Sequence, residues 1–203
     1  MPGKLFVISG PSGSGKSTVV RGVRKRMKDV SYSVSHTTRH RRAGEEEGRD
    51  YCFVDRETFE RMIDEGAFVE WAPVYNDLYG TSITGLRGQL EAGLDVLLDL
   101  DTQGAAAIRK GFQNSILIFL FPPSMEALET RLKSRGTDEK EIIEERLKKA
   151  REEMGKFVRY DYAVINNDLE QAVEEVKAII LSERCRAERV GAALRRMFDL
   201  PNI

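Results

Sequence analysis

The chain has 203 residues, enough to bury a complete α/β core, and its 32 lysines and arginines nearly balance 33 aspartates and glutamates. The resulting net charge of −1 excludes a global basic field that would recruit nucleic acid or an anionic membrane. Cys52 and Cys185 lie far apart without metal-ligand spacing, and the longest apolar run falls far short of the roughly 20 residues of a membrane span. We therefore expect a cytoplasmic protein with reduced thiols, built as one domain or as a core with insertions.

In chain order, the first predicted strand, Leu5–Ile8, is followed by Gly10–Ser17, which reads GPSGSGKS and fits the pattern G-x-x-x-x-G-K-[ST]. Apolar residues then repeat at helical spacing at positions 19, 20, 23 and 27. Strand, glycine-rich loop and helix in this order form the context of a phosphate-binding loop (P-loop). Its backbone N–H groups, the positive end of the helix and the Lys16 ammonium predict a polyphosphate ligand, whereas the alternative is an ordinary Gly/Ser turn.

After the first predicted helix, the chain continues as a strand, a charged loop and a small insertion. Residues 32–35 are a second predicted strand, and residues 37–50, TTRHRRAGEEEGRD, form a charged loop that either binds a ligand or is simply solvated. Short predicted strands at 51–54 and 68–71 flank a predicted helix at 56–65, which indicates a small α+β insertion. His36 and His40 lack metal-ligand partners at suitable spacing, so we expect them to be loop residues.

The remaining segments alternate strands with helices. Predicted helices cover residues 83–92, 102–110 and 125–134, and predicted strands cover 94–101, 116–121 and 162–165. Strand alternation places Asp99 and Asp101 on one side, and Ser124 is a predicted helix cap. Residues 135–156 are dense in charge with a thin apolar stripe, which is typical of a mobile flap or of a solvated surface helix.

Apolar residues repeat at helical spacing from Leu169 to Met197, which predicts a long C-terminal helix that packs on the core or on a second subunit. The alternation as a whole predicts an α/β fold with a parallel sheet between helices. The P-loop would then lie at the carboxyl edge of the sheet, where such sheets bind ligands.

Several separated motifs point to a known family. The sequence resembles the guanylate kinases of the nucleoside monophosphate kinase group in SVSHTTRHRRAGEEEGRDY at residues 33–51, FVEW at 68–71, YGTS at 79–82, LLDLDTQG at 97–104 and SRGTDEKEIIEERL at 134–147. The similarity extends from the P-loop to VINND at 164–168. It implies a P-loop NTPase three-layer sandwich with core segments at 1–32, 86–124 and 158–203, a GMP-binding insertion at 33–85 and a lid at 125–157. The family transfers the γ-phosphoryl group of ATP to GMP with Mg²⁺, giving ADP and GDP.

The resemblance also implies roles for individual residues. Phosphoryl transfer needs positioned charge more than covalent help. The matching catalytic cations are Lys16, Arg42, Arg135 and Arg146. The matching ATP contacts are Gly10, Pro11, Ser12, Gly13, Ser14, Gly15, Lys16, Ser17 and Thr18 in the loop, with Arg131, Arg135 and Asn166 beyond it. Ser17 would ligate Mg²⁺, and Asp99 would either hold Mg²⁺ through water or orient Arg42.

The expected GMP site follows from the base and its phosphate. Guanine offers N1–H and its 2-amino group as adjacent donors and O6 as an acceptor, which suits a carboxylate and a hydroxyl. The residues that match the family's GMP contacts are the carboxylates Glu70 and Asp101, the hydroxyls Ser35 and Thr81, and the phosphate-binding Arg39, Arg42, Tyr51 and Tyr79. Arg41 stands where the family often has proline and Asn167 where an acidic residue is common, so the stiffness of the loop before Arg42 stays open.

Two other functions are open from the sequence. A guanylate-kinase-like binding module would keep the fold without catalysis, but such modules typically lose parts of the P-loop or the arginines, which this chain retains. A kinase of a ribose phosphate or of another nucleotide would have no use for Glu70, Ser35 and Thr81 together. We therefore expect ATP and GMP as substrates and no nucleic acid or membrane partner, and a homo-oligomer is left open.

Overall fold

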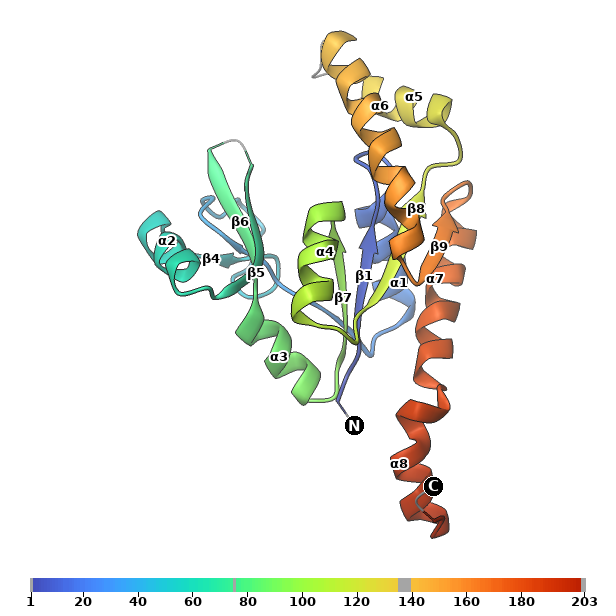
Figure 1. Ribbon diagram of the computed structural model, residues 1–203. Helices are drawn as coiled ribbons and strands as arrows, with labels where there is room; N and C mark the ends of the chain where they lie inside the picture. Colours follow the sequence, from blue (N-terminus) through green and yellow to red (C-terminus); the bar gives the residue numbers. More distant parts are fainter. Residues whose placement is uncertain (1, 75, 135–139, 202–203) are drawn as a thin grey trace.

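The computed structural model describes residues 2–74, 76–134 and 140–201, and its centre is a five-stranded parallel sheet (Figure 1). The strand order is β2-β7-β1-β8-β9. These strands are β1 (Leu5–Ser9), β2 (Val30–Tyr32), β7 (Asp95–Leu100), β8 (Ile116–Phe121) and β9 (Tyr162–Ile165). Strand β1 therefore lies between β7 and β8, and the loop that leaves its carboxyl end emerges at the middle of the sheet edge.

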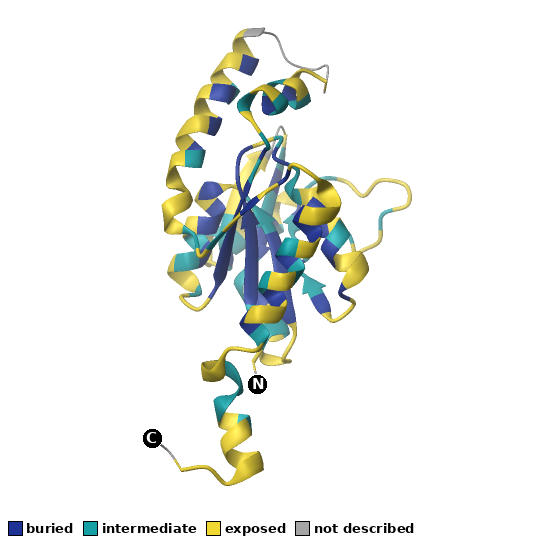
Figure 2. Cartoon of the chain, turned by 90° about the vertical axis from the view of Figure 1, so that its right-hand side faces the viewer, coloured by how far each residue is buried: buried dark blue, intermediate teal, exposed yellow. Residues whose placement is uncertain are grey.

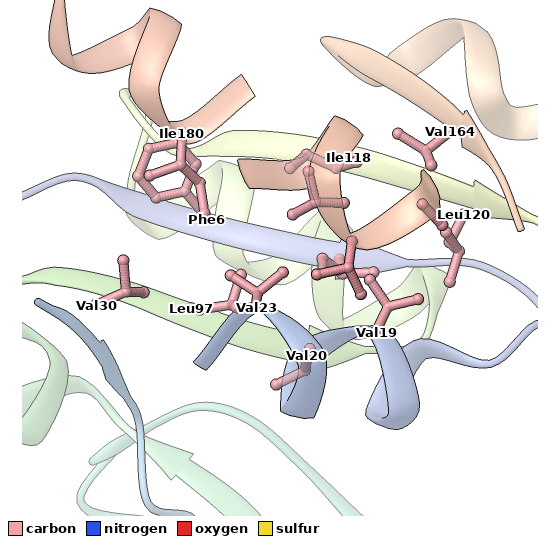
Figure 3. Close-up of a cluster of buried hydrophobic side chains, with 14 of the residues drawn as sticks. Phe6, Val19, Val20, Val23, Val30, Leu97, Ile118, Leu120, Val164 and Ile180 are labelled. Carbon is pink, nitrogen blue, oxygen red and sulfur yellow. The ribbon is translucent and has the colours of Figure 1, made fainter. Parts of the chain in front are cut away.

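Helices cover both faces of this sheet. Helices α1 (Lys16–Arg26) and α7 (Leu169–Arg184) pack on one face, where Phe6, Val23 and Ile180 belong to one buried cluster (Figure 3). Helices α3 (Ile83–Glu91) and α4 (Thr102–Gly111) pack on the other. The central strands are apolar throughout because both of their faces are buried. The predicted three-layer α/β sandwich is confirmed.

A second, four-stranded sheet with the order β4-β3-β6-β5 stands beside the first (Figure 1). Its strands are β3 (His36–Thr37), β4 (Cys52–Phe53), β5 (Phe68–Val74) and β6 (Asp77–Ser82), and helix α2 (Arg56–Asp64) packs against them. Its small core contains Phe59, Phe68 and Leu78. The sequence did not predict β6, because Gly80 in a strand interior weakens the strand pattern. A Cβ at Gly80 would lie 2.9 Å from Phe68 and 3.1 Å from Phe59, so this close packing requires glycine.

Helices α5 (Met125–Lys133) and α6 (Lys140–Met154) lie beyond the carboxyl ends of the main strands, and the 3₁₀ helix η1 (Gly155–Arg159) follows (Figure 1). Ser124 caps α5 as predicted, since its Oγ accepts a hydrogen bond of 3.1 Å from the Ala127 N–H. The apolar stripe of α6 packs against α5 in a separate cluster, formed by Leu128, Leu132, Ile143, Leu147 and Ala150. The charged segment therefore has a small core of its own.

The predicted long C-terminal helix is wrong, because the chain forms α7 and then α8 (Ala187–Phe198). The buried carboxylate of Asp95 accepts hydrogen bonds from Arg184 Nε at 2.6 Å and from Arg189 Nη2 at 2.8 Å. Residues five apart point about 140° away from each other on a continuous helix, and the break between α7 and α8 turns both arginines toward one carboxylate. None of the described residues of α8 is buried, and the helix projects from the amino end of the sheet (Figure 2).

Two further local predictions differ from the structure. The second strand is Val30–Tyr32 and not 32–35, because the buried Val30 pairs beside Asp95 and the chain then crosses to the small sheet. His36 belongs to β3 and packs edge-on against Phe68, with ring centroids 5.7 Å apart, so it is not a loop residue. Among the helices that the structure describes, none combines the length and apolarity needed to cross a bilayer.

Candidate active site

The P-loop connects β1 to α1 and depends on two glycines that lie against neighbouring groups. Gly10 has φ +147 and Gly15 has φ +99, a region that side chains rarely adopt. A Cβ at Gly10 would lie 2.4 Å from the Leu120 carbonyl oxygen, and one at Gly15 would lie 2.3 Å from Asn166 Nδ2. No described side chain caps the start of α1, so the loop and the helix end present backbone N–H groups for an anion.

Lys16 lies directly over this loop. Its Nζ donates hydrogen bonds to the carbonyl oxygens of Gly10 at 2.7 Å and of Pro11 at 3.1 Å. The ammonium group is therefore held beside the first residues of the loop, where it can contribute positive charge to an anion. Ser14 is buried in the same loop, whereas Ser12 and Thr18 are exposed.

Arg131 and Asn166 contact the outer side of the P-loop. The buried Asn166 donates from Nδ2 to the Ser14 carbonyl oxygen at 2.8 Å. Arg131 Nη1 donates to the carbonyl oxygens of Gly13 and Ser14, and its Nη2 donates to that of Asn166, each at 3.4 Å. Because Arg131 belongs to α5, these bonds connect the helical pair above the sheet to the P-loop. Arg146 is half-buried on α6, and Arg135 lies outside the described residues.

The Asp99 carboxylate joins α1 to the strand edge. Ser17 Oγ donates to Asp99 Oδ2 and the Tyr32 hydroxyl donates to Asp99 Oδ1, both at 2.7 Å. Burial, followed by the neighbouring Asp99 charge, raises the pKa of Tyr32 far above its ordinary value, so Tyr32 remains a hydrogen-bond donor. Strand β7 ends at Leu100, so alternation does not extend to Asp101, whose carboxylate instead caps α4.

Ser17 and Asp99 fit a hard cation such as Mg²⁺, because they bring a hydroxyl and a carboxylate oxygen together. Within the described parts of the chain, no group of three His, Cys, Asp or Glu side chains forms a metal cage. Such a pair suits Mg²⁺ that takes its remaining ligands from water and substrate phosphates.

A second group of polar residues surrounds Arg39 on the small sheet. Arg39 Nε donates to the Tyr79 hydroxyl at 3.2 Å, and its guanidinium carbon lies 5.4 Å from the centre of the Tyr51 ring. Arg42 is exposed nearby, and its backbone N–H donates to Glu45 Oε2 at 2.8 Å. These contacts place the Arg39 guanidinium beside the Tyr79 hydroxyl and the Tyr51 ring, with the exposed Arg42 further along the same loop, and such a group suits a phosphate dianion.

A cleft of about 440 Å³ lies between α1 and the small sheet. Ser17 and Asp99 line it from the main sheet side, and Ser35, Tyr51 and Tyr79 line it from the other. Three residues predicted for GMP therefore face the predicted metal pair across a single hollow, although they come from segments far apart in sequence. The other residues predicted for GMP do not line this cleft: Arg39, Arg42, Glu70, Thr81 and Asp101.

Glu70, Thr81 and Asp101 form a third group beside the first turn of α4. The Thr81 hydroxyl donates to Glu70 Oε1 at 2.5 Å, and Asp101 Oδ1 accepts from the N–H groups of Gln103 and Gly104 at 2.9 and 2.8 Å. Burial raises the pKa of the Glu70 carboxyl, and the nearby Asp101 charge adds to that effect although the Thr81 bond opposes it. A ligand that brings adjacent N–H donors would relieve this cost.

Sequence reasoning missed three residues in these groups. Tyr32 was assigned only to a strand, and its bond to Asp99 spans 67 positions of sequence. Glu45 is one of three consecutive glutamates, which no local pattern distinguishes. Glu153, on the last turn of α6, is buried, which raises its pKa; the nearby charges of Lys149 and Lys16 act in the opposite direction.

The P-loop at the middle of a parallel sheet edge, opposite a second cationic group on a separate small sheet, defines a P-loop kinase with two anionic substrates. The guanylate kinase family model matches residues 2–183 of the chain. The chain therefore belongs to the guanylate kinase family.

Individual relatives agree with this assignment. The chain is 48% identical to a guanylate kinase of Syntrophotalea carbinolica over 198 residues, which cover 98% of this chain and 94% of that protein. It is 48% identical to a guanylate kinase of Caldanaerobacter subterraneus subsp. tengcongensis, with 92% and 91% covered. The crystal structure of guanylate kinase from Anaplasma phagocytophilum superimposes with a TM-score of 0.74 at 33% identity, covering 99% of this chain and 98% of that one.

Proposed function

We propose that this protein transfers the γ-phosphoryl group of ATP to GMP and releases ADP and GDP. The observation that carries the proposal is the arrangement of three groups: the P-loop with Lys16, the arginines of the small sheet, and the pair formed by Glu70 and Thr81. Two phosphate-bearing substrates repel each other in water, and this arrangement supplies positive charge to each of them.

On the donor side, the P-loop N–H groups and Lys16 bind the β- and γ-phosphates of ATP. Residues 10–18 form this part of the site, and Arg131 with Asn166 holds its outer side in place. Arg146 approaches the transferring group from α6, and we assign the same role to Arg135. Ser17 and Asp99 would hold Mg²⁺, which would supply positive charge that neutralises the phosphate oxygens.

On the acceptor side, Arg39, Arg42, Tyr51 and Tyr79 bind the phosphate of GMP. Glu70 and Asp101 accept hydrogen bonds from the guanine N1–H and 2-amino groups, and the hydroxyls of Ser35 and Thr81 complete the polar contacts to GMP. The paired carboxylates support a preference for guanine over adenine, because adenine has an acceptor at N1 and no 2-amino group. Adenine would leave desolvated carboxylate oxygens without donors.

The proposed division of the chain assigns the core to residues 1–32, 86–124 and 158–203. Residues 33–85 bind GMP, and residues 125–157 form a lid over ATP. Closing either part brings arginines together, so bound phosphates favour closure by neutralising them. We also propose a cytoplasmic location, supported by the free thiols of Cys52 and Cys185, and self-association through the exposed Leu194 and Met197 of α8.

A coupled assay of ADP release tests the proposed reaction with Mg·ATP and, in turn, GMP, dGMP, AMP and ribose phosphates. We expect turnover with GMP and a kcat/KM for AMP lower by a factor on the order of 10³ or more, since two or three unpaired polar groups each cost about 1–3 kcal/mol. An absence of GMP-dependent ADP release would contradict the proposal and favour a binding module. A preference for a ribose phosphate would indicate the other kinase class.

A further inference from the structure

The loop at residues 39–45 carries both arginines that the proposed function assigns to the GMP phosphate. It reads RHRRAGE and contains no proline, so no ring restricts its backbone. Gly44 has φ +88, and a Cβ added there would contact no described heavy atom within 4 Å. Packing therefore does not fix the tip of the loop at Gly44. The Arg39 guanidinium lies over the rings of Tyr51 and Phe53, and hydrogen bonds supply the other constraints on both arginines.

One carboxylate makes the required bonds. Glu45 Oε1 accepts from Arg39 Nη2 at 2.6 Å, and Glu45 Oε2 accepts from the Arg42 backbone N–H at 2.8 Å. The Glu45 backbone N–H in turn donates to the Arg42 carbonyl oxygen at 3.2 Å. Arg42 and Glu45 are thus joined across the turn by two hydrogen bonds, one donated by each residue. The Glu45 side chain also holds the guanidinium of Arg39.

The other contacts of Arg39 complete its orientation. Nε donates to the Tyr79 hydroxyl at 3.2 Å and Nη1 donates to the His40 carbonyl oxygen at 2.9 Å. Together with Glu45, described residues engage three of the five N–H donors of a guanidinium. Both Glu45 and Tyr79 line the cleft of about 440 Å³, so this network lies at the wall of the proposed GMP site.

Resting on the proposed function, we propose that Glu45 is a positioning residue for the phosphate of GMP, acting through the Arg39 side chain and the Arg42 backbone. The hydrogen bond from Arg39, followed by that from the Arg42 N–H, holds the pKa of the Glu45 carboxyl below its ordinary value. The carboxylate is therefore ionised throughout the neutral range and accepts both bonds at once.

A carboxylate beside a phosphate site can also compete with the phosphate for Arg39. The geometry favours positioning, because the second oxygen of Glu45 is bound to a backbone N–H that also closes the turn. The two roles predict opposite signs. A competing carboxylate weakens GMP binding and its removal strengthens it, whereas removal of a positioning carboxylate weakens GMP binding.

The test uses calorimetric binding of GMP and of guanosine to the full chain, with steady-state kinetics in parallel. Glu45→Gln keeps the shape but offers one acceptor and one NH₂ group, so it cannot accept from both donors. We expect the Kd and KM for GMP to rise roughly tenfold, the scale of one hydrogen bond to a charged group. The Kd for guanosine and the KM for ATP should change less than about twofold, since guanosine has the base without the phosphate.

Glu46→Gln is the matched control, because Glu46 is exposed in the same loop and pairs with Arg49 at 2.6 Å. It should leave all of these constants unchanged. Unchanged or tighter GMP binding by Glu45→Gln would overturn the positioning role, and so would equal weakening of GMP and guanosine, which indicates a general loss of loop structure. If Glu45→Gln does not fold, Glu45→Asp applies the same test, because its shorter side chain does not span both donors. If the proposed function itself is wrong, the unaltered protein will release no ADP in response to GMP, which is a separate result from the effect of Glu45→Gln.

Discussion

Substitution of Glu70 by glutamine tests whether this side chain reads guanine or only supports the small sheet. In the structure Glu70 accepts a hydrogen bond of 2.5 Å from the Thr81 hydroxyl and lies near the Asp101 carboxylate, whose charge affects its pKa. Glutamine keeps the shape of the side chain but replaces two anionic acceptors with one carbonyl oxygen and one NH₂ group. Guanine would lose one charged hydrogen bond, and its remaining donor would meet a neutral acceptor.

The expected size of the effect follows from that count. A hydrogen bond to a charged group contributes about 1.5–3 kcal/mol, which corresponds to a loss of roughly 10- to 150-fold in kcat/KM for GMP. AMP should change little or improve, because the new NH₂ group can donate to adenine N1. The ratio of kcat/KM for GMP to kcat/KM for AMP should therefore fall.

The same substitution should raise the stability of the unliganded protein, although it lowers kcat/KM for GMP. Burial raises the folded-state pKa of Glu70 above the ordinary 4.5, so ionisation costs the folded protein stability as the pH rises from about 4.5 through the folded pKa. Without ligands, Glu70→Gln should melt at a higher temperature than the unaltered protein at neutral pH. The difference in melting temperature should disappear below pH 4.5, where the Glu70 carboxyl is neutral in both the folded and the unfolded state of the unaltered protein.

The assay measures kcat/KM for both nucleotides at saturating Mg·ATP, together with thermal melts at several pH values. Glu65→Gln is a suitable control, because Glu65 is exposed at the end of α2 on the same small sheet. Equal losses for GMP and AMP would refute the reasoning, since they would show that Glu70 supports the structure and does not recognise the base.

Three other perturbations test separate parts of the protein. Lys16→Met should lower kcat by about 10²-fold or more, while loss of its bonds to Gly10 and Pro11 shifts the melting temperature by only a few degrees; near-normal turnover would contradict the catalytic role. Phe59→Ala removes a fully buried ring that stacks on Phe68 at 4.5 Å and should cost about 3–5 kcal/mol in a denaturant titration, and an unchanged midpoint would refute this packing argument. Small-angle scattering should show a smaller radius of gyration with GMP and a non-hydrolysable ATP analogue bound together than without ligands, and no contraction would argue against closure.

Local chemistry explains what could be predicted from the sequence. The P-loop is recognisable because its φ angles and close contacts restrict Gly10 and Gly15 to one residue type, wherever the loop occurs. The strands at the centre of the sheet are recognisable because burial on both faces demands continuous apolar residues. The fold class and most element boundaries follow from these short-range patterns, whereas the family follows from the resemblance of several separated motifs.

Contacts between distant segments decided the rest. Ser17 meets Asp99 across 82 positions only because β1 and β7 are neighbours in the sheet, with Ile8 opposite Asp99. The C-terminal segment forms two helices, and arginines on both sides of the break bind one carboxylate, that of Asp95. Helical periodicity describes which residues share a face, but it does not record which buried charge must be neutralised. Sheet register and the cost of an unpaired buried carboxylate determine these features, and both exist only in the assembled tertiary structure.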